Sequence, residues 1–326
     1  GQNPSRQAGL KAGLPTTLSA VTVNKVCGSG LQSVIQAAQS IKAGDTNIVV
    51  AGGMENMSNA PHLAHVRNGI KFGEGKLLDH MQHDGLTCPF ENWGMGSAAE
   101  WTAEEFKISR EAQDIYSAQS HQRAAHAISE GWFNDEQITL ESKQVKQRFD
   151  VTQDEGVRAD SSAESLGKLR PAFAKEGTVT AGNASQISDG GAAVIVASPD
   201  TQGEVLVRIV DYNTQGVDPK EIFTAPGKGI ASLLERNGLT VSDIDLFEIN
   251  EAFAAQVLQN LDYLGLDQTN VNVCGGGIAL GHPIGGSGAR VLVTLIHQMR
   301  RLDAKRGVVS LCLGGGNAVS MLLERD

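Results

Sequence analysis

Four residues whose side chains can do chemistry stand where a strand-like apolar run gives way to a turn. They are Cys27, Asn250, His282 and Cys312. Thiols and an imidazole can act as nucleophile, base or acid, and a carboxamide can orient a polar group beside them. Open α/β sheets place functional groups at the ends of their strands. The four residues therefore predict a functional site.

Cys27 has the most favourable position of the four for nucleophilic chemistry. The sequence predicts a short buried strand at 21–24, a helix with apolar residues at helical spacing over 31–41, and a second strand at 48–51. This βαβ order places Cys27 at a helix N-terminus, where unpaired N–H groups and the helix dipole lower the pKa of a thiol. A small buried hydrophobe is the commoner role of a single cysteine, so this segment alone leaves both interpretations open.

His282 lies in a glycine-rich stretch, residues 272–290. Glycines let the backbone pass close to a ligand before it enters a helix, and the apolar pattern that begins at Val291 predicts that helix. A plain glycine-rich turn or a loose dinucleotide loop is the alternative interpretation of this stretch.

Composition bounds the class of protein. The 326 residues are 40% hydrophobic, which is enough for a sizeable core and two domains, and 38 glycines with only 5% aromatic residues suit close-packed α/β layers. A net charge of -10 argues against nucleic acid or an anionic membrane surface as a partner. No apolar run reaches the length of a membrane span. Widely spaced cysteines indicate free thiols in a reducing compartment.

Residues 57–187 interrupt the α/β pattern with a long polar excursion. Two helices are expected in it, one containing Trp101 and one that starts after Ser109 as N-cap and stops at Gly131. Two close histidine pairs have the spacing of metal ligands, but their glycine-rich polar surroundings favour solvated surface histidines. These pairs are His62 with His65, and His80 with His83.

The α/β pattern returns near residue 190 and continues to the end of the chain. We expect strands at 190–196, 205–210, 246–249 and 271–273, a final hairpin of 308–313 with 319–323, and helices at 230–236, at 251–261 and after His282. The excursion is therefore an insertion into the first half.

Four segments occur in order along the chain: 24–31 (NKVCGSGL), 250–254 (NEAFA), 281–285 (GHPIG) and 312–316 (CLGGG). Together they resemble the thiolase family, specifically acetyl-CoA acetyltransferases and 3-ketoacyl-CoA thiolases. The loop 178–185 (TVTAGNAS) is similar to a segment of that family as well. These motifs extend over nearly the whole chain, so the resemblance is specific.

The resemblance implies a thiolase-like α/β fold with two similar βαβ-type halves, mixed sheets covered by helices, and an inserted loop domain. Residues 1–56 and 188–210 would form the first half, 57–187 the loop domain that binds CoA, and 211–326 the second half. Family members carry a further strand, helix and strand before the position of Gly1. We therefore expect an incomplete first half, without this N-terminal segment, whose sheet exposes hydrophobic surface.

The resemblance also implies a reversible Claisen condensation, two acetyl-CoA to acetoacetyl-CoA plus CoA, with ping-pong kinetics. Cys27 would be the acylated nucleophile, and His282 would receive its proton and donate to a thioester oxygen. Cys312 would act as acid and base on the second substrate, and Asn250 would hold a water near the enolate oxygen. The N–H groups of Cys27 and Gly314 would form a second oxyanion hole.

CoA and acyl-CoA thioesters would be the substrates, with no permanently bound cofactor and no metal. Ser185 would contact the pantetheine and Arg158 the adenine end, while Phe173, Met95 and Phe253 would line the channel or the acyl pocket. The basic residues near Arg158 could receive phosphates, although a solvated face is their usual role. We expect a cytoplasmic homodimer or homotetramer of fatty acid metabolism, without nucleic-acid or membrane partners.

Gly94 departs from the family pattern, because many biosynthetic thiolases have a histidine before the following Met-Gly pair. A longer-chain 3-ketoacyl-CoA thiolase of β-oxidation is therefore an alternative, and a catalytically silent CoA-binding protein is another. A ketoacyl synthase is disfavoured because that group has two histidines with its cysteine. A redox thiol protein would need a paired cysteine motif.

Overall fold

A computed structural model of the chain describes residues 1–145 and 148–326. The helices are α1 Pro4–Lys11, α2 Ser29–Ala43, α3 Met95–Glu105, α4 Arg110–Ser129, α5 Ser142–Val145, α6 Ala163–Gly167, α7 Ala225–Arg236, α8 Ala254–Leu264, α9 Gly277–Leu280 and α10 Ile284–Arg301. Short helical turns are η1 Met57–Asn59, η2 Met81–Gly85, η3 Pro219–Thr224 and η4 Val241–Asp243. The strands are β1 Ile48–Asn56, β2 His62–Leu63, β3 Leu78–Asp79, β4 Thr87–Cys88, β5 Trp93–Gly94, β6 Asp189–Ala197, β7 Arg208–Gly216, β8 Leu246–Ile249, β9 Arg306–Leu313 and β10 Asn317–Glu324.

The larger sheet has four strands in the order β7-β10-β9-β8. β8 is parallel to β9, whereas β10 is antiparallel to both of its neighbours. All four residues of β8 are buried, as expected for a parallel strand that is covered on both faces. α7 packs against β7, β9 and β10, while α10 packs against β8 and β9. The sheet is therefore mixed and lies between helices.

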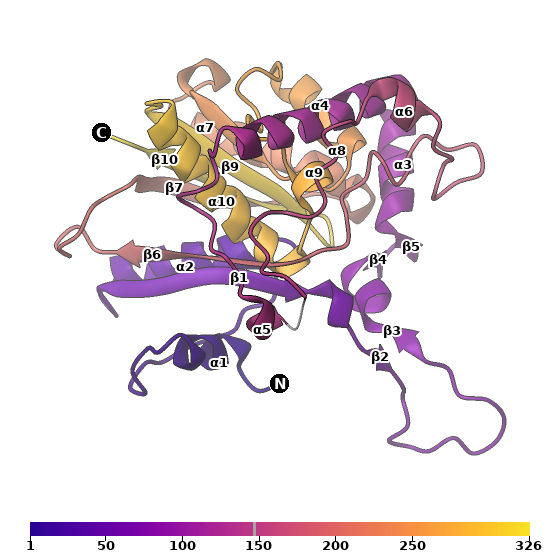
Figure 1. Cartoon of the computed structure of the whole chain (residues 1–326), viewed down its shortest axis with the longest axis horizontal. Helices are drawn as coiled ribbons and strands as arrows, with labels where there is room; N and C mark the ends of the chain where they lie inside the picture. Colours follow the sequence, from indigo (N-terminus) through magenta and orange to yellow (C-terminus); the bar gives the residue numbers. More distant parts are fainter. Residues whose placement is uncertain (146–147) are drawn as a thin grey trace.

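A second layer consists of β1 and β6, which pair antiparallel from Ile48 with Ala197 to Asn56 with Asp189. α2 and α10 lie side by side between this layer and the four-stranded sheet (Figure 1). A side chain on Gly53 of β1 would start 2.1 Å from the carbonyl oxygen of Gly285. The absence of a side chain there lets α10 approach β1 closely.

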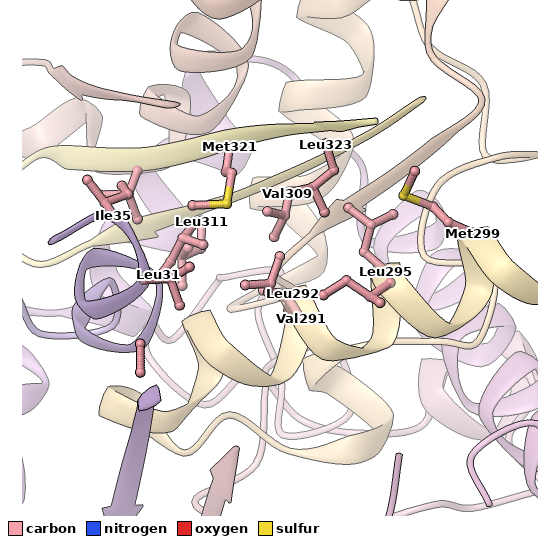
Figure 2. Close-up of a cluster of buried hydrophobic side chains, with 14 of the residues drawn as sticks. Leu31, Ile35, Val291, Leu292, Leu295, Met299, Val309, Leu311, Met321 and Leu323 are labelled. Carbon is pink, nitrogen blue, oxygen red and sulfur yellow. The ribbon is translucent and has the colours of Figure 1, made fainter. Parts of the chain in front are cut away.

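The main hydrophobic core fixes α10 in place. Apolar side chains from one face of α10 meet side chains of α2, β9 and β10 (Figure 2). They include Leu31 and Ile35 of α2, Val291, Leu292, Leu295 and Met299 of α10, Val309 and Leu311 of β9, and Met321 and Leu323 of β10. Burial of such side chains is the main force that holds these elements together. The loop with His282 enters directly into this anchored helix.

Helices of the excursion pack against the second half. α3 contacts α8 and η3, and α4 contacts α8 and α9. Ser109 caps α4 by accepting a hydrogen bond from the N–H of Ala112, which confirms the expected N-cap. The excursion thus supplies helices that contact α8, which follows Asn250, and α9, which precedes His282.

Most expected elements are present, and the exceptions have physical reasons. The strand expected at 21–24 is wrong: Val21 is 72% exposed, and no strand of the described residues pairs with this run. β1 consequently pairs with β6 and is not the second strand of a βαβ unit. The strand expected at 271–273 is reduced to isolated bridges, from Val271 to Phe247 and from Val273 to Gly275. The strand expected at 205–210 begins at Arg208 and joins the larger sheet beside β10.

The two-stranded sheet of β1 and β6 exposes hydrophobic side chains, as expected for the first half. Ile48, Val50 and Met54 of β1 and Ile195 of β6 are each more than half exposed. Among the described residues, no helix has the length and apolar character needed to cross a membrane.

Candidate active site

Cys27 lies in a tight turn that leads into α2. Gly28 N–H donates to Lys25 O at 3.0 Å, and Ser29 N–H donates to Val26 O at 3.1 Å. Val26 has a φ of 49°, a left-handed conformation that is unfavourable for a β-branched residue and is kept mainly where the surroundings enforce it. The turn holds Cys27 directly before Gly28, the N-cap of α2, as the sequence predicts.

The end of β9 and the bend after it face Cys27. The N–H groups of Gly314 and of Cys27 itself lie near enough to the Cys27 sulfur to lower the pKa of its thiol. Cys312 is buried near the end of β9, and its thiol is close enough for charge on Cys27 to raise its pKa. Two thiols and two N–H groups therefore share one small space. Such a pair of N–H groups can stabilise an oxyanion.

His282 is buried in the loop between α9 and α10. Its Nδ1 atom lies 2.5 Å from the Oγ atom of Ser287, whose hydroxyl donates to the carbonyl of Pro283 at 2.8 Å. Because Ser287 has a single hydroxyl proton, Nδ1 of the imidazole must be the donor in its contact with Ser287. This tautomer leaves Nε2 without a proton, so Nε2 can act as a base.

Asn250 directly follows β8 and is buried beside His282. Its Nδ2 atom is 3.4 Å from Nδ1 of His282, and its backbone N–H donates to Ser310 O at 3.0 Å. The Oδ1 atom is buried without a hydrogen-bond partner among the described residues. A buried polar atom without a partner is costly, so this amide has free capacity for a water or a substrate oxygen.

An apolar cluster adjoins the Cys312 thiol. Phe253 and Cys312 belong to one buried cluster, and Met95 packs against it. The ring of Phe173 meets that of Phe253 edge to face, with 6.2 Å between ring centroids. A side chain on Gly96 would start 2.1 Å from the Phe173 ring, so glycine is needed there. The structure therefore brings together the three residues expected at the acyl pocket.

Ser185 and Arg158 are the residues expected to contact CoA, and they lie beside different elements. The Ser185 N–H donates to Ala252 O at 2.9 Å, which places Ser185 beside the NEAF segment. The Arg158 side chain is exposed, and its backbone N–H donates to Nδ1 of His121 at 3.2 Å. Neither residue contacts the thiols. Ser185 is partly exposed and Arg158 is exposed.

Two family models cover almost the whole chain. The thiolase N-terminal domain matches residues 1–200, and the thiolase C-terminal domain matches residues 203–325. The chain belongs to the thiolase family. The resemblance drawn from the four sequence motifs is thereby confirmed, and so is the assignment as an acyltransferase enzyme.

Named relatives and solved structures agree with this membership. An acetyl-CoA acetyltransferase of Pseudomonas aeruginosa is 48% identical and one of Escherichia coli is 49% identical, and each match covers 100% of this thiolase and 84% of the relative. The crystal structure of human mitochondrial 3-ketoacyl-CoA thiolase in complex with CoA superposes with a TM-score of 0.93 at 42% identity, over 98% of this chain and 82% of that one. A Bacillus anthracis acetyl-CoA acetyltransferase also gives 0.93, at 41% identity, over 99% and 83%. The predicted thiolase fold is confirmed.

The expected low pKa of Cys27 is wrong for this structure. Burial raises the pKa of the Cys27 thiol to about 12, and the N–H groups of Cys27 and Gly314 oppose this only in part. Burial also raises the pKa of Cys312 and lowers that of His282 to about 4. Desolvation therefore outweighs the helix terminus. Burial therefore favours the neutral forms of both thiols and of the imidazole.

Three residues that contact the site were missed by sequence reasoning. Ser287 holds the imidazole of His282, Glu55 accepts from the N–H of Gly285, and Glu251 accepts from groups around the NEAF segment. Ser287 follows His282 by five residues, and a hydroxyl on the first turn of the helix was an available signal. The partners of Glu55 and Glu251 lie far away in sequence, so no local pattern could identify them.

Other residues considered from the sequence stay apart from this site. The four cysteines are free thiols. Cys88 and Cys274 are buried in other places, Cys274 in a cluster with Ala127 and Phe133. His62, His65 and His83 are exposed, and within 1–145 and 148–326 no group of histidine, cysteine and acidic residues could hold a metal ion.

Proposed function

We propose that this thiolase catalyses the reversible condensation of two acetyl-CoA to acetoacetyl-CoA and CoA through an acetyl thioester on Cys27. The observation that carries the proposal is that the Cys27 and Cys312 thiols lie together with the N–H groups of Cys27 and Gly314. Glu55, whose charge reaches Cys27, also accepts from the N–H of Gly285, three residues after the buried His282. The acetyl-CoA acetyltransferases among its relatives support acetyl-CoA as the substrate.

The first half-reaction would begin with proton transfer from Cys27 to Nε2 of His282 as the sulfur attacks the thioester carbonyl. The N–H groups of Cys27 and Gly314 would stabilise the tetrahedral oxyanion. CoA would leave as its thiol with a proton from Cys312. The products are acetyl-Cys27, an imidazolium and a Cys312 thiolate, and the two opposite charges offset the cost of burying each alone.

The second half-reaction would use that charge pair. The Cys312 thiolate removes an α-proton from the second acetyl-CoA, while the imidazolium and a water held by Asn250 stabilise the enolate oxygen. The enolate carbon attacks acetyl-Cys27, and acetoacetyl-CoA leaves as the Cys27 sulfur recovers its proton from His282. The unpartnered Oδ1 of Asn250 supports this role.

CoA would extend from Cys27 along Phe253, Met95 and Phe173 toward Ser185 and Arg158. The grouping of the three apolar residues and the exposure of Arg158 support this course. We keep 1–56 with 188–210 as the first half, 57–187 as the loop domain and 211–326 as the second half, with β7 spanning the last boundary. We also propose a cytoplasmic enzyme of fatty acid metabolism, and the exposed apolar residues of β1 and β6 support a homodimer or homotetramer.

A longer-chain 3-ketoacyl-CoA thiolase is the second candidate. A side chain on Gly94 would meet only ordinary contacts, 3.7 Å from Gln82 and 3.8 Å from Leu86, so space is open there. Trp93 and Met95 on either side pack against the cluster that holds Cys312. Human mitochondrial 3-ketoacyl-CoA thiolase and an acetyl-CoA acetyltransferase superpose equally well, so the structural likeness admits this candidate without favouring it.

Intact-protein mass spectrometry after brief exposure to acetyl-CoA tests the proposal. We expect one acetyl adduct that maps to Cys27, is discharged by free CoA and is absent from Cys27→Ser. Cys274→Ser is the matched control, since this thiol is buried elsewhere, and it should form the adduct normally. A folded protein that forms no adduct would contradict the proposed function.

A further inference from the structure

Glu251 has a buried carboxylate that four donors surround. Its Oε1 atom accepts from the hydroxyl of Tyr116 at 2.8 Å and from Nδ2 of Asn272 at 3.1 Å. Its Oε2 atom accepts from the hydroxyl of Ser120 at 2.7 Å and from the N–H of Ile278 at 3.1 Å. The residue is only 1% exposed. All four donors are neutral, and each would lose a charge-assisted hydrogen bond without the carboxylate.

Three glycines allow the chain to close around this carboxylate. A side chain on Gly276 would start 2.5 Å from Cδ of Glu251, and one on Gly277 would start 2.5 Å from the Glu251 carbonyl oxygen. At Gly275 the obstacle would be the carbonyl oxygen of Ser120, at 2.4 Å. The glycine run before His282 therefore allows close packing against Glu251 and α4.

Glu251 joins the two chain segments that carry the polar groups of the site. It directly follows Asn250, and its Oε2 atom is bonded to the N–H of Ile278 in α9, which ends at Leu280, two residues before His282. Between these segments, Nδ2 of Asn250 and Nδ1 of His282 are 3.4 Å apart. Tyr116 and Ser120 tie the same carboxylate to α4.

We propose that Glu251 is a positioning residue that sets the separation of Asn250 and His282, and that Tyr116 and Ser120 hold this arrangement against α4. The inference rests on the proposed function, since it takes Asn250 and His282 as the groups that stabilise the enolate. A carboxylate with four donors in a buried site is rigid because no water can replace it without leaving donors unpaired. A displacement of about 1 Å in such groups can reduce a rate by roughly 100-fold.

Substitution of Glu251 with a matched control tests the inference. We expect Glu251→Ala to lower kcat by roughly 100-fold in both half-reactions, with KM for acetyl-CoA within about twofold of the wild-type value. Glu251→Gln should recover most of the rate, because its amide oxygen can still accept from Ser120 and Ile278 while the Tyr116 hydroxyl turns to accept from the amide. Asn272 loses its bond to residue 251 but keeps its acceptors on Tyr116 and Ile249. Glu248→Gln is the control: it lies on the same chain segment, is equally buried and faces Arg290. Wild-type kcat in a folded Glu251→Ala protein, or an equal loss in Glu248→Gln, would overturn the proposal.

The imidazole of His282 gives a readout that does not depend on turnover. NMR titration of histidine-labelled protein, with the signal assigned by comparison with His282→Asn, should show a His282 pKa near 4 in the wild type. Because burial is the main cause of this low pKa, a loosened site in Glu251→Ala should move the pKa toward its ordinary value. An unchanged titration would count against the positioning role. Absence of acetyl-Cys27 in the wild type would contradict the proposed function alone, and this titration would still decide the role of Glu251.

Single-donor variants keep the test decisive where Glu251→Ala does not fold. Tyr116→Phe and Ser120→Ala each remove one hydrogen bond to the carboxylate. Each should lower kcat by roughly 3- to 10-fold with KM unchanged, in line with a small displacement. Lower thermal stability with wild-type kcat in both variants would show a purely structural role and overturn the inference.

Discussion

Oε2 of Glu55 accepts a hydrogen bond from the N–H of Gly285 at 3.0 Å, which brings a carboxylate of β1 to the first turn of α10. The same carboxylate is close enough to Cys27 to raise the pKa of its thiol, in addition to burial. Anions are favourable at a helix N-terminus, yet this one disfavours the Cys27 thiolate. Glu55 therefore helps to keep the Cys27 thiol protonated.

Glu55→Gln should make Cys27 more reactive in the free enzyme. The glutamine keeps an oxygen acceptor for Gly285 but removes the negative charge, so the pKa of Cys27 falls and its thiolate fraction at a given pH rises. We expect iodoacetamide to alkylate Cys27 roughly 3- to 10-fold faster at pH 8, since a tenfold change corresponds to one pKa unit. Peptide mapping over a pH series measures this rate. Glu74→Gln, an exposed loop residue, serves as control, and equal rates in all three proteins would contradict the prediction.

Ser287→Ala should lower catalysis by removing the acceptor that fixes the imidazole tautomer. Without it, Nδ1 of His282 loses its 2.5 Å contact and the two tautomers become closer in energy. We expect kcat for thiolysis of acetoacetyl-CoA to fall by roughly 10- to 100-fold, as for other residues that orient a reacting histidine. Ser117→Ala is the matched control, because Ser117 is buried and its hydroxyl donates to Gln113 O in the same four-residue pattern. A comparable loss in the control would show that the effect is one of general stability.

Glu248→Gln should change the pH dependence of stability. Burial raises the pKa of Glu248 to about 8, although Arg290 opposes the shift. In the unfolded chain this carboxyl ionises near its ordinary value, so its contribution is fully present below that value and is lost as pH rises to about 8. From pH 5 to pH 9 we expect the variant to gain about 1 kcal/mol or more over the wild type in free energy of unfolding. Urea denaturation at pH 5, 7 and 9 measures this, with exposed Glu176→Gln as control, and parallel curves would refute it.

The sequence predicted features that depend on neighbouring residues, such as the ends of helices. Cys27, Asn250, His282 and Cys312 could be found because each follows an apolar run, and Gly44 and Ser109 mark helix ends through rules that act within a few residues. The pairing of β1 with β6 joins residues that are 133 positions apart at Asn56 with Asp189 and 149 apart at Ile48 with Ala197, so no local sequence period could predict it. The run at 21–24 looked like a strand, but an apolar run becomes a strand only beside a partner.

The pKa of Cys27 shows a different limit. The sequence correctly predicted the helix N-terminus, but the sign of the pKa shift depends on how much water reaches the sulfur. That quantity is set by packing of the Cys27 turn against the Gly314 bend, where Val26 would be 3.4 Å from a side chain on Gly314. Desolvation of this kind arises only in the assembled site.

Gly94→His should shift acyl-chain preference toward acetyl groups. Gly94 has a φ of -75°, which any residue adopts, and a side chain there would meet Gln82 and Leu86 only at ordinary contact distances. An imidazole can therefore be accommodated without strain beside Trp93 and Met95, where it would occupy space that a longer acyl chain needs. We expect kcat/KM for 3-ketooctanoyl-CoA to fall roughly 10-fold or more relative to acetoacetyl-CoA, the range that steric exclusion of a few methylenes gives. Gly94→Ser, which fills less of this space, should give an intermediate ratio. Equal losses for both substrates would place Gly94 outside the acyl pocket, whereas a selective loss would identify the residue that leaves this thiolase open to longer chains.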